Sequence, residues 1–78
     1  MVKLEFTEAV MIGREIEFTC NGKSYFESHE ANDRWYIQCE EDQTIQYFES
    51  AENLLNNAII DGIPLDELWD NIKIQYIL

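Results

Sequence analysis

The sequence contains few of the residues that bind phosphates or metal ions. Its three glycines stand singly at positions 13, 22 and 62, so it has no glycine-rich loop that cradles a phosphate group. It has one histidine and two cysteines, and the cysteines lack the paired spacing of a zinc site. The carboxylates of residues 40–42 are expected to form a solvated loop rather than a cation site. We therefore expect neither a metal nor a cofactor.

Long apolar runs are also absent. The longest run, residues 9–12, is too short to cross a membrane or to act as a secretion signal. The simplest location for such a chain is the cytoplasm, where Cys20 and Cys39 would remain free thiols.

Basic residues are scarce, with five Lys and Arg against 16 Asp and Glu and a formal net charge of −11. This charge repels nucleic-acid phosphates and anionic lipids, so we expect no direct binding to nucleic acids or membranes. Two explanations stay open: the charge provides solubility, or it attracts a basic protein by imitating a nucleic acid. The candidate acidic surface residues are Glu40, Glu41, Asp42, Asp66, Glu67 and Asp70.

The hydrophobic content, 46% of the residues, predicts a single compact domain over residues 1–78. The apolar residues before Gly13 favour a short helix that ends at this glycine over an extended start. From Arg14 the apolar period changes to two, which is typical of a half-buried strand. Asn21-Gly22 then predicts a two-residue hairpin turn, because both positions require a positive φ angle.

The register of this hairpin assigns each side chain to one side of the sheet. The predicted pairs on the first side are Cys20 with Lys23, Phe18 with Tyr25, and Ile16 with Glu27. Cys20 and Cys39 then lie about 9.6 Å apart, two strand spacings. A disulfide needs Cα atoms within about 7 Å, so none is expected.

A second hairpin is predicted from the alternation around residues 35–39 and 45–48. A loop of residues 40–42 places Ile37 opposite Ile45, whereas a loop of residues 40–43 places Ile37 opposite Gln46 and mixes apolar with polar side chains. We favour the shorter loop, with Asp42 in the left-handed conformation that such loops need.

The remaining residues predict two helices and a last strand. Ser50 is a suitable N-cap for a helix whose apolar spacing continues until Gly62. Pro64 suits the first turn of a second short helix, and the ending KIQYIL alternates like a strand. The predicted fold is α+β: an antiparallel β-sheet, a meander with an Asn-Gly hairpin, with helices packed on one face in the order α-β-β-β-β-α-α-β.

The sheet face away from the helices is the candidate binding surface. The predicted registers place on it three aromatic residues and an acidic neighbour: Phe26, Tyr36, Phe48 and Glu17. Either Phe48 tucks under the helix that begins at Ser50 and the other rings lie flat on neighbouring side chains, or the face binds a protein partner or a second copy.

Catalysis is not expected. The run Ser28-His29-Glu30 suggests a nucleophile and a base, but neighbouring residues of a strand point to opposite faces. No carboxylate is marked by the sequence as buried with a raised pKa.

Two stretches carry a resemblance to a known group. GREIEFTCNGKSY at residues 13–25 and YFESAENLLNNAIIDGIPLDELWDNIKIQYI at residues 47–77 resemble uncharacterised small acidic proteins of Gram-positive bacteria and their mobile elements. The proteins of this group carry, like this sequence, a glycine, a strand, an Asn-Gly hairpin, a helix and a DG…L.E.W..I.I ending. The resemblance implies a compact α+β domain in a bacterial cytoplasm and transfers no catalytic residue.

The expected function is a non-enzymatic protein-interaction module with an unknown protein partner or self-association. The alternative is an acidic inhibitor that mimics nucleic acid and occupies a basic DNA- or RNA-binding protein.

Overall fold

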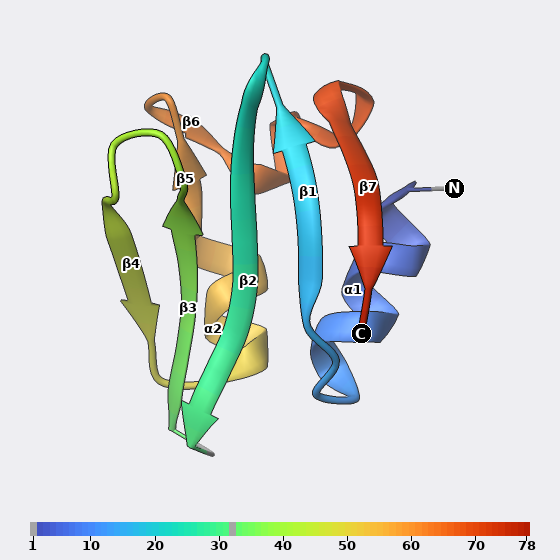
Figure 1. Cartoon of the computed structure of the whole chain (residues 1–78). Helices are drawn as coiled ribbons and strands as arrows, with labels where there is room; N and C mark the ends of the chain where they lie inside the picture. The colour runs from blue at the N-terminus through green and yellow to red at the C-terminus, as the bar shows by residue number, and fades with distance from the viewer. Residues whose placement is uncertain (1, 32) are drawn as a thin grey trace.

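The computed structural model describes residues 2–31 and 33–78 and shows two helices against one face of a five-stranded antiparallel sheet (Figure 1). The strands lie in the order β4-β3-β2-β1-β7, and β5 and β6 form a separate two-stranded sheet. The elements are α1 (Val2–Met11), β1 (Ile16–Cys20), β2 (Lys23–Ala31), β3 (Arg34–Cys39), β4 (Ile45–Phe48), α2 (Ala51–Asn57), β5 (Ile59–Ile60), β6 (Ile63–Pro64), the 3-10 turns η1 (Leu65–Glu67) and η2 (Trp69–Asn71), and β7 (Ile72–Ile77).

The first helix and the first hairpin are confirmed. The chain leaves α1 through Gly13, whose φ of +84° is accessible mainly to glycine. Asn21 and Gly22 both have positive φ angles, 52° and 83°, as a two-residue hairpin turn requires. The β1–β2 register is the predicted one, with Phe18 opposite Tyr25.

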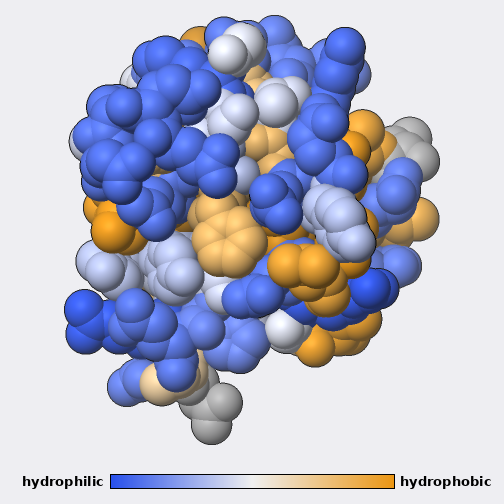
Figure 2. All heavy atoms as spheres, in the orientation of Figure 1, coloured by the Kyte–Doolittle hydropathy of each residue, from blue (hydrophilic) through white to orange (hydrophobic). Residues whose placement is uncertain are grey.

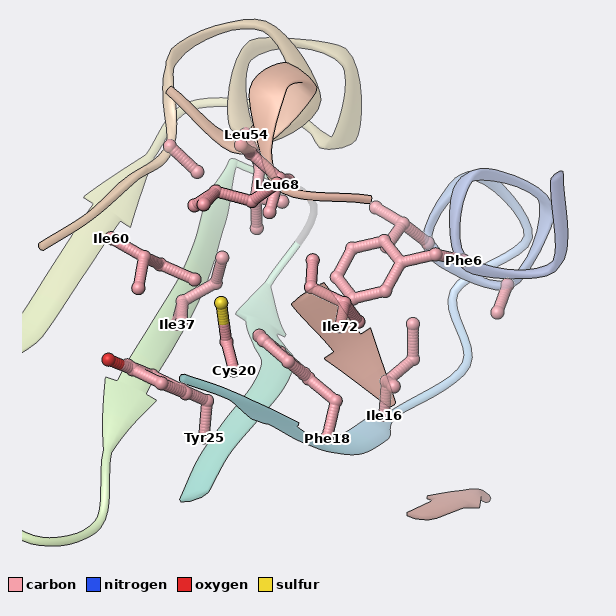
Figure 3. Packing of buried hydrophobic residues seen from close by; sticks show 14 of the residues in the cluster. Phe6, Ile16, Phe18, Cys20, Tyr25, Ile37, Leu54, Ile60, Leu68 and Ile72 are labelled. Atoms are coloured by element: carbon pink, nitrogen blue, oxygen red, sulfur yellow. The ribbon is translucent and has the colours of Figure 1, made fainter. Parts of the chain in front are cut away.

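The hydrophobic core lies between the sheet and the helices. Phe6 of α1 points toward the sheet (Figure 3), and its ring meets Phe18 edge-on with a centroid distance of 5.1 Å. Leu54 of α2 and Leu68 cover the same side of the sheet and are buried. Burial of each such side chain contributes about 1.5–3 kcal/mol to the hydrophobic driving force.

The predicted register of the second hairpin is wrong by one residue. Ile37 lies opposite Gln46, and the loop contains residues 40–43. The left-handed residue is Gln43, with φ 63°, whereas Asp42 accepts hydrogen bonds from Thr44. Gln46 is tolerated on the helix-facing side because its side-chain amide bonds the backbone of Ile59 twice, at 2.6 and 3.0 Å.

The segment after α2 differs in detail from the predicted helices. Ser50 is the N-cap, and its hydroxyl accepts a hydrogen bond from the Asn53 backbone at 2.9 Å. The helix ends at Asn57, before the predicted end at Gly62, and the chain continues into β5 and β6, which are joined by a turn in which Asp61 and Gly62 have positive φ angles. The second helical segment consists of the two short turns η1 and η2; Leu65 of η1 and Leu68, between the two turns, are buried.

The last strand returns to the sheet as predicted and pairs with β1. Its register shifts between Glu17 and Phe18, so that Glu17 lies opposite Tyr76 and Phe18 opposite Ile74. The shift turns Ile77 toward the core and leaves Tyr76 exposed. With this strand, the fold class is confirmed as α+β with the order α-β-β-β-β-α-α-β, the small β5–β6 hairpin being inserted before the second helical segment.

Replacing Gln46 tests the connection between β4 and β5. Gln46→Met keeps the side-chain length and removes both bonds to Ile59, so we expect the free energy of unfolding to fall by about 1 kcal/mol. For a domain of this size that loss lowers Tm by about 4–8 °C. Thermal unfolding followed by circular dichroism measures the change.

Gln38→Met is the matched control, because Gln38 lies on the sheet face away from the helices and its side-chain amide donates to the side chain of Gln43 within the same hairpin. An equal loss of stability in both variants would contradict the role given to Gln46.

Candidate functional site

The sheet face away from the helices, called the outer face below, lies toward the viewer in Figure 1. Figure 2, in the same orientation, shows a mostly hydrophilic surface with an apolar area near the centre of the sheet. The strand registers bring apolar and aromatic side chains from four strands to this face: Phe26, Tyr36, Ile45, Tyr47 and Tyr76.

Three of these rings form a continuous row across β2, β3 and β4. The Phe26 and Tyr36 ring centroids are 6.4 Å apart, and those of Tyr36 and Tyr47 are 6.0 Å apart. Both separations lie within the range of favourable aromatic pairs. The Arg34 guanidinium lies over the Tyr47 ring at 4.6 Å and ends the row. We call Phe26, Tyr36 and Tyr47 the aromatic row.

The prediction of Phe48 on this face is wrong. The register shift of the second hairpin places Phe48 opposite Trp35 on the helix-facing side, where it packs against the core. Tyr47 takes its place on the outer face and is 49% exposed. Phe26, Tyr36 and Glu17 lie on the outer face as predicted, with Glu17 between Phe26 and Tyr76.

The predicted acidic residues fall into two groups. Glu40, Glu41 and Asp42 lie in the loop before β4, and Asp66, Glu67 and Asp70 lie in the segment before β7. The first group borders the edge strand β4, whereas Asp66 of the second group lies on the helix side of the sheet, in a hollow that residues of α1 and α2 line.

Three of these carboxylates hold the local structure. Glu41 accepts a hydrogen bond from the Ser24 backbone at 2.9 Å. Hydrogen bonds from the backbone and hydroxyl of Thr44 lower the pKa of Asp42. Asp66 accepts a bond from the Trp69 indole at 2.9 Å and pairs with Lys3 at 3.2 Å, and these contacts lower its pKa.

The run Ser28-His29-Glu30 does not assemble a nucleophile with a base. Ser28 points to the outer face and donates a 2.6 Å hydrogen bond to Glu15. His29 points to the other face, where its ring stacks on Trp35 at 4.3 Å. Glu30 pairs with Arg34 at 3.1 Å.

Glu27 is a buried acid that the sequence analysis did not mark. It has no exposed surface, and both of its carboxylate oxygens lack a hydrogen-bond partner among the described residues. Burial, with a smaller effect from the negative charge of Glu15, raises the pKa of Glu27 to about 8. The predicted register already placed Glu27 opposite Ile16 on the core side, and this placement was the signal in the sequence that Glu27 is buried. A side chain without exposed surface contacts no substrate in this conformation.

An open hollow of about 580 Å³ lies at the end of β4. It is lined by Asp33, Arg34, Tyr47, Phe48, Glu49 and Asn53. Within residues 2–31 and 33–78, no helix has the length and apolar character needed to cross a membrane. The same residues contain no group of three or more metal-binding side chains.

Comparison of the chain with protein-family models, with curated proteins and with solved structures gave no match.

Glu27 makes stability depend on pH. Between pH 4.5 and about 8 the folded protein keeps a proton on Glu27 that the unfolded chain releases, so stability falls as pH rises through this interval. The largest expected slope from this one group is about 1.4 kcal/mol per pH unit. Urea unfolding of the wild type and of Glu27→Gln from pH 5 to pH 8.5 measures it.

The variant should lose less stability than the wild type as pH rises. Glu17→Gln is the control, because Glu17 is an exposed carboxylate on the outer face of the neighbouring strand. If the stability of the wild type and of Glu27→Gln changes equally with pH, ionisation of Glu27 does not destabilise the fold and the prediction is wrong.

Proposed function

We propose that the chain is a non-enzymatic, cytoplasmic protein-interaction module that binds its partner through the outer face. The observation that carries the proposal is the aromatic row, three rings in contact across three strands on a face that no helix covers. Contiguous exposed apolar area tends to mark interaction sites, and tyrosine is enriched in them.

The surroundings of the row support recognition of a protein. Ile45, 41% exposed, extends the apolar surface along β4, and Tyr76, 58% exposed, lies on the same face beyond Glu17. Polar groups border it, including Glu17, Gln38 and the Arg34–Glu30 pair. An apolar centre with a polar rim is the usual composition of a protein interface.

The two cysteine thiols support the proposed cytoplasmic location. Cys20 and Cys39 are buried and free, which suits a reducing compartment. The resemblance to small acidic proteins of Gram-positive bacteria and their mobile elements supports a bacterial cytoplasm.

Imitation of a nucleic acid is less well supported. A mimic presents a continuous array of carboxylates, whereas one acidic group lies in the loop before β4 and the other lies after β6, with Asp66 on the helix side of the sheet. Glu41, Asp42 and Asp66 are also engaged in local hydrogen bonds. The acidic charge therefore serves solubility and the choice of partner rather than forming the binding surface by itself.

Capture experiments with matched variants test the proposal. Tagged wild-type protein and the variants Phe26→Ala and Tyr36→Ala are incubated with cell lysate, and the bound proteins are compared by quantitative mass spectrometry. We expect at least about ten-fold less of the same partner on each variant, because central aromatic residues dominate interface energies. Circular dichroism should show that both variants remain folded.

Ile12→Ala is the control, since Ile12 is 72% exposed beyond the end of α1, away from the outer face. A partner that binds both aromatic variants as well as the wild type and is lost in about 0.5 M salt, where the Debye length is about 4 Å, would support nucleic-acid mimicry instead. Unfolding of both variants would make these rings part of the core and would overturn the proposal.

A further inference from the structure

The free edge of β4 is the least protected backbone of the sheet. An edge strand exposes unpaired N–H and C=O groups, and proteins usually guard it with a charged residue, a proline or a bulge. Within β4, Ile45–Phe48, there is no charged residue and no proline, and its pairing with β3 is regular. The opposite edge strand, β7, carries Lys73 and the register shift beside Gln75.

The hydrogen-bond pattern identifies the backbone groups at this edge. The Cys39 N–H donates to the Thr44 carbonyl at 2.9 Å, so Thr44 is turned toward β3. Bonding alternates along an antiparallel strand, which turns Gln46 toward β3 and the N–H and C=O groups of Ile45 and Tyr47 away from it. These N–H and C=O groups can form hydrogen bonds with an additional strand.

We infer that β4 binds an extended, basic segment of a partner protein as a sixth strand of the sheet. The inference rests on the proposed function, since it names how the module binds and the kind of partner segment it takes. Added strands gain affinity from backbone hydrogen bonds and specificity from alternate side chains. Here one side of the new strand continues the outer face beside Ile45 and Tyr47, which are already exposed.

The charge around β4 selects a basic occupant. Exposed carboxylates precede the strand at residues 40–42 and follow it at Glu49 and Glu52. Asp33 and Glu49 line the hollow at the end of β4, where a lysine or arginine of the added strand would meet them. The only base in that lining, Arg34, is paired with Glu30.

The same charges disfavour a second copy of this chain. Each copy carries a formal charge of −11. Antiparallel pairing of two β4 strands would place the loop of residues 40–42 of one copy beside Glu49 of the other, which brings like charges together.

Peptide binding to the whole chain tests the inference. The probe is a capped peptide of about eight residues, a typical strand length, that alternates valine and lysine. At saturation we expect hydrogen exchange of the Ile45 and Tyr47 amides, measured by NMR, to slow by at least about ten-fold, while that of the Lys73 amide on β7 is unchanged. Two further peptides are compared: one N-methylated at alternate residues, and one with glutamate in place of lysine. Both should bind at least about ten-fold more weakly.

A proline at position 45 tests the edge from the side of the protein. Ile45→Pro removes an outward N–H at the first residue of an edge strand, where proline is tolerated, and should weaken the peptide at least about ten-fold. Ile45→Val shortens the same side chain but keeps the N–H, so it should bind the peptide clearly more tightly than Ile45→Pro. Equal binding of the N-methylated peptide, absence of binding, unchanged exchange at Ile45 and Tyr47, or a dimer paired through β4 would each overturn the inference.

The two proposals fail separately. A partner captured by Ile45→Pro but not by Tyr36→Ala overturns the edge-strand inference and leaves the outer face as the binding surface. The reverse pattern overturns the role of the outer face and supports the edge.

Discussion

The Asn21-Gly22 turn fixes the register of β2, and the rest of the sheet depends on that register. β2 is the central strand, so its alternation decides which side chains meet the helices and which form the outer face. It places Tyr25 in the core and Phe26 outside. It also buries Glu27 without a hydrogen-bond partner, and a shift of one residue would exchange all of these positions.

The sequence predicts this first hairpin because its turn needs two residues with positive φ, and Asn-Gly supplies both. The second hairpin has no comparable turn, so its register was inferred from the match of apolar side chains. That match failed because Gln46 finds hydrogen-bond partners at Ile59, thirteen residues along the chain. Such a long-range contact leaves no local pattern in the sequence, and it moved Phe48 to the core and Tyr47 to the outer face.

The remaining differences have similar causes. Asp61-Gly62 carries the same turn chemistry as Asn21-Gly22, but the helical spacing of the apolar residues before it concealed the β5–β6 hairpin. The register shift in β7 follows from pairing with β1, which alternation within one strand does not reveal. Most of the candidate surface was still predictable, because Phe26, Tyr36 and Glu17 depend only on the registers of β1, β2 and β3.

The acidic charge explains how the edge strand β4 and the outer face can stay uncovered without self-association. An uncharged edge strand beside exposed aromatic rings normally invites self-association. Here carboxylates lie at both ends of β4, so each copy repels another at the place where their strands would pair. The same field lowers the free energy of a basic segment at that edge, because opposite charges favour encounter and like charges suppress wrong partners. Protection against self-pairing and the proposed selection of a basic partner would thus follow from one distribution of charge, without a proline or lysine that would close the edge to both.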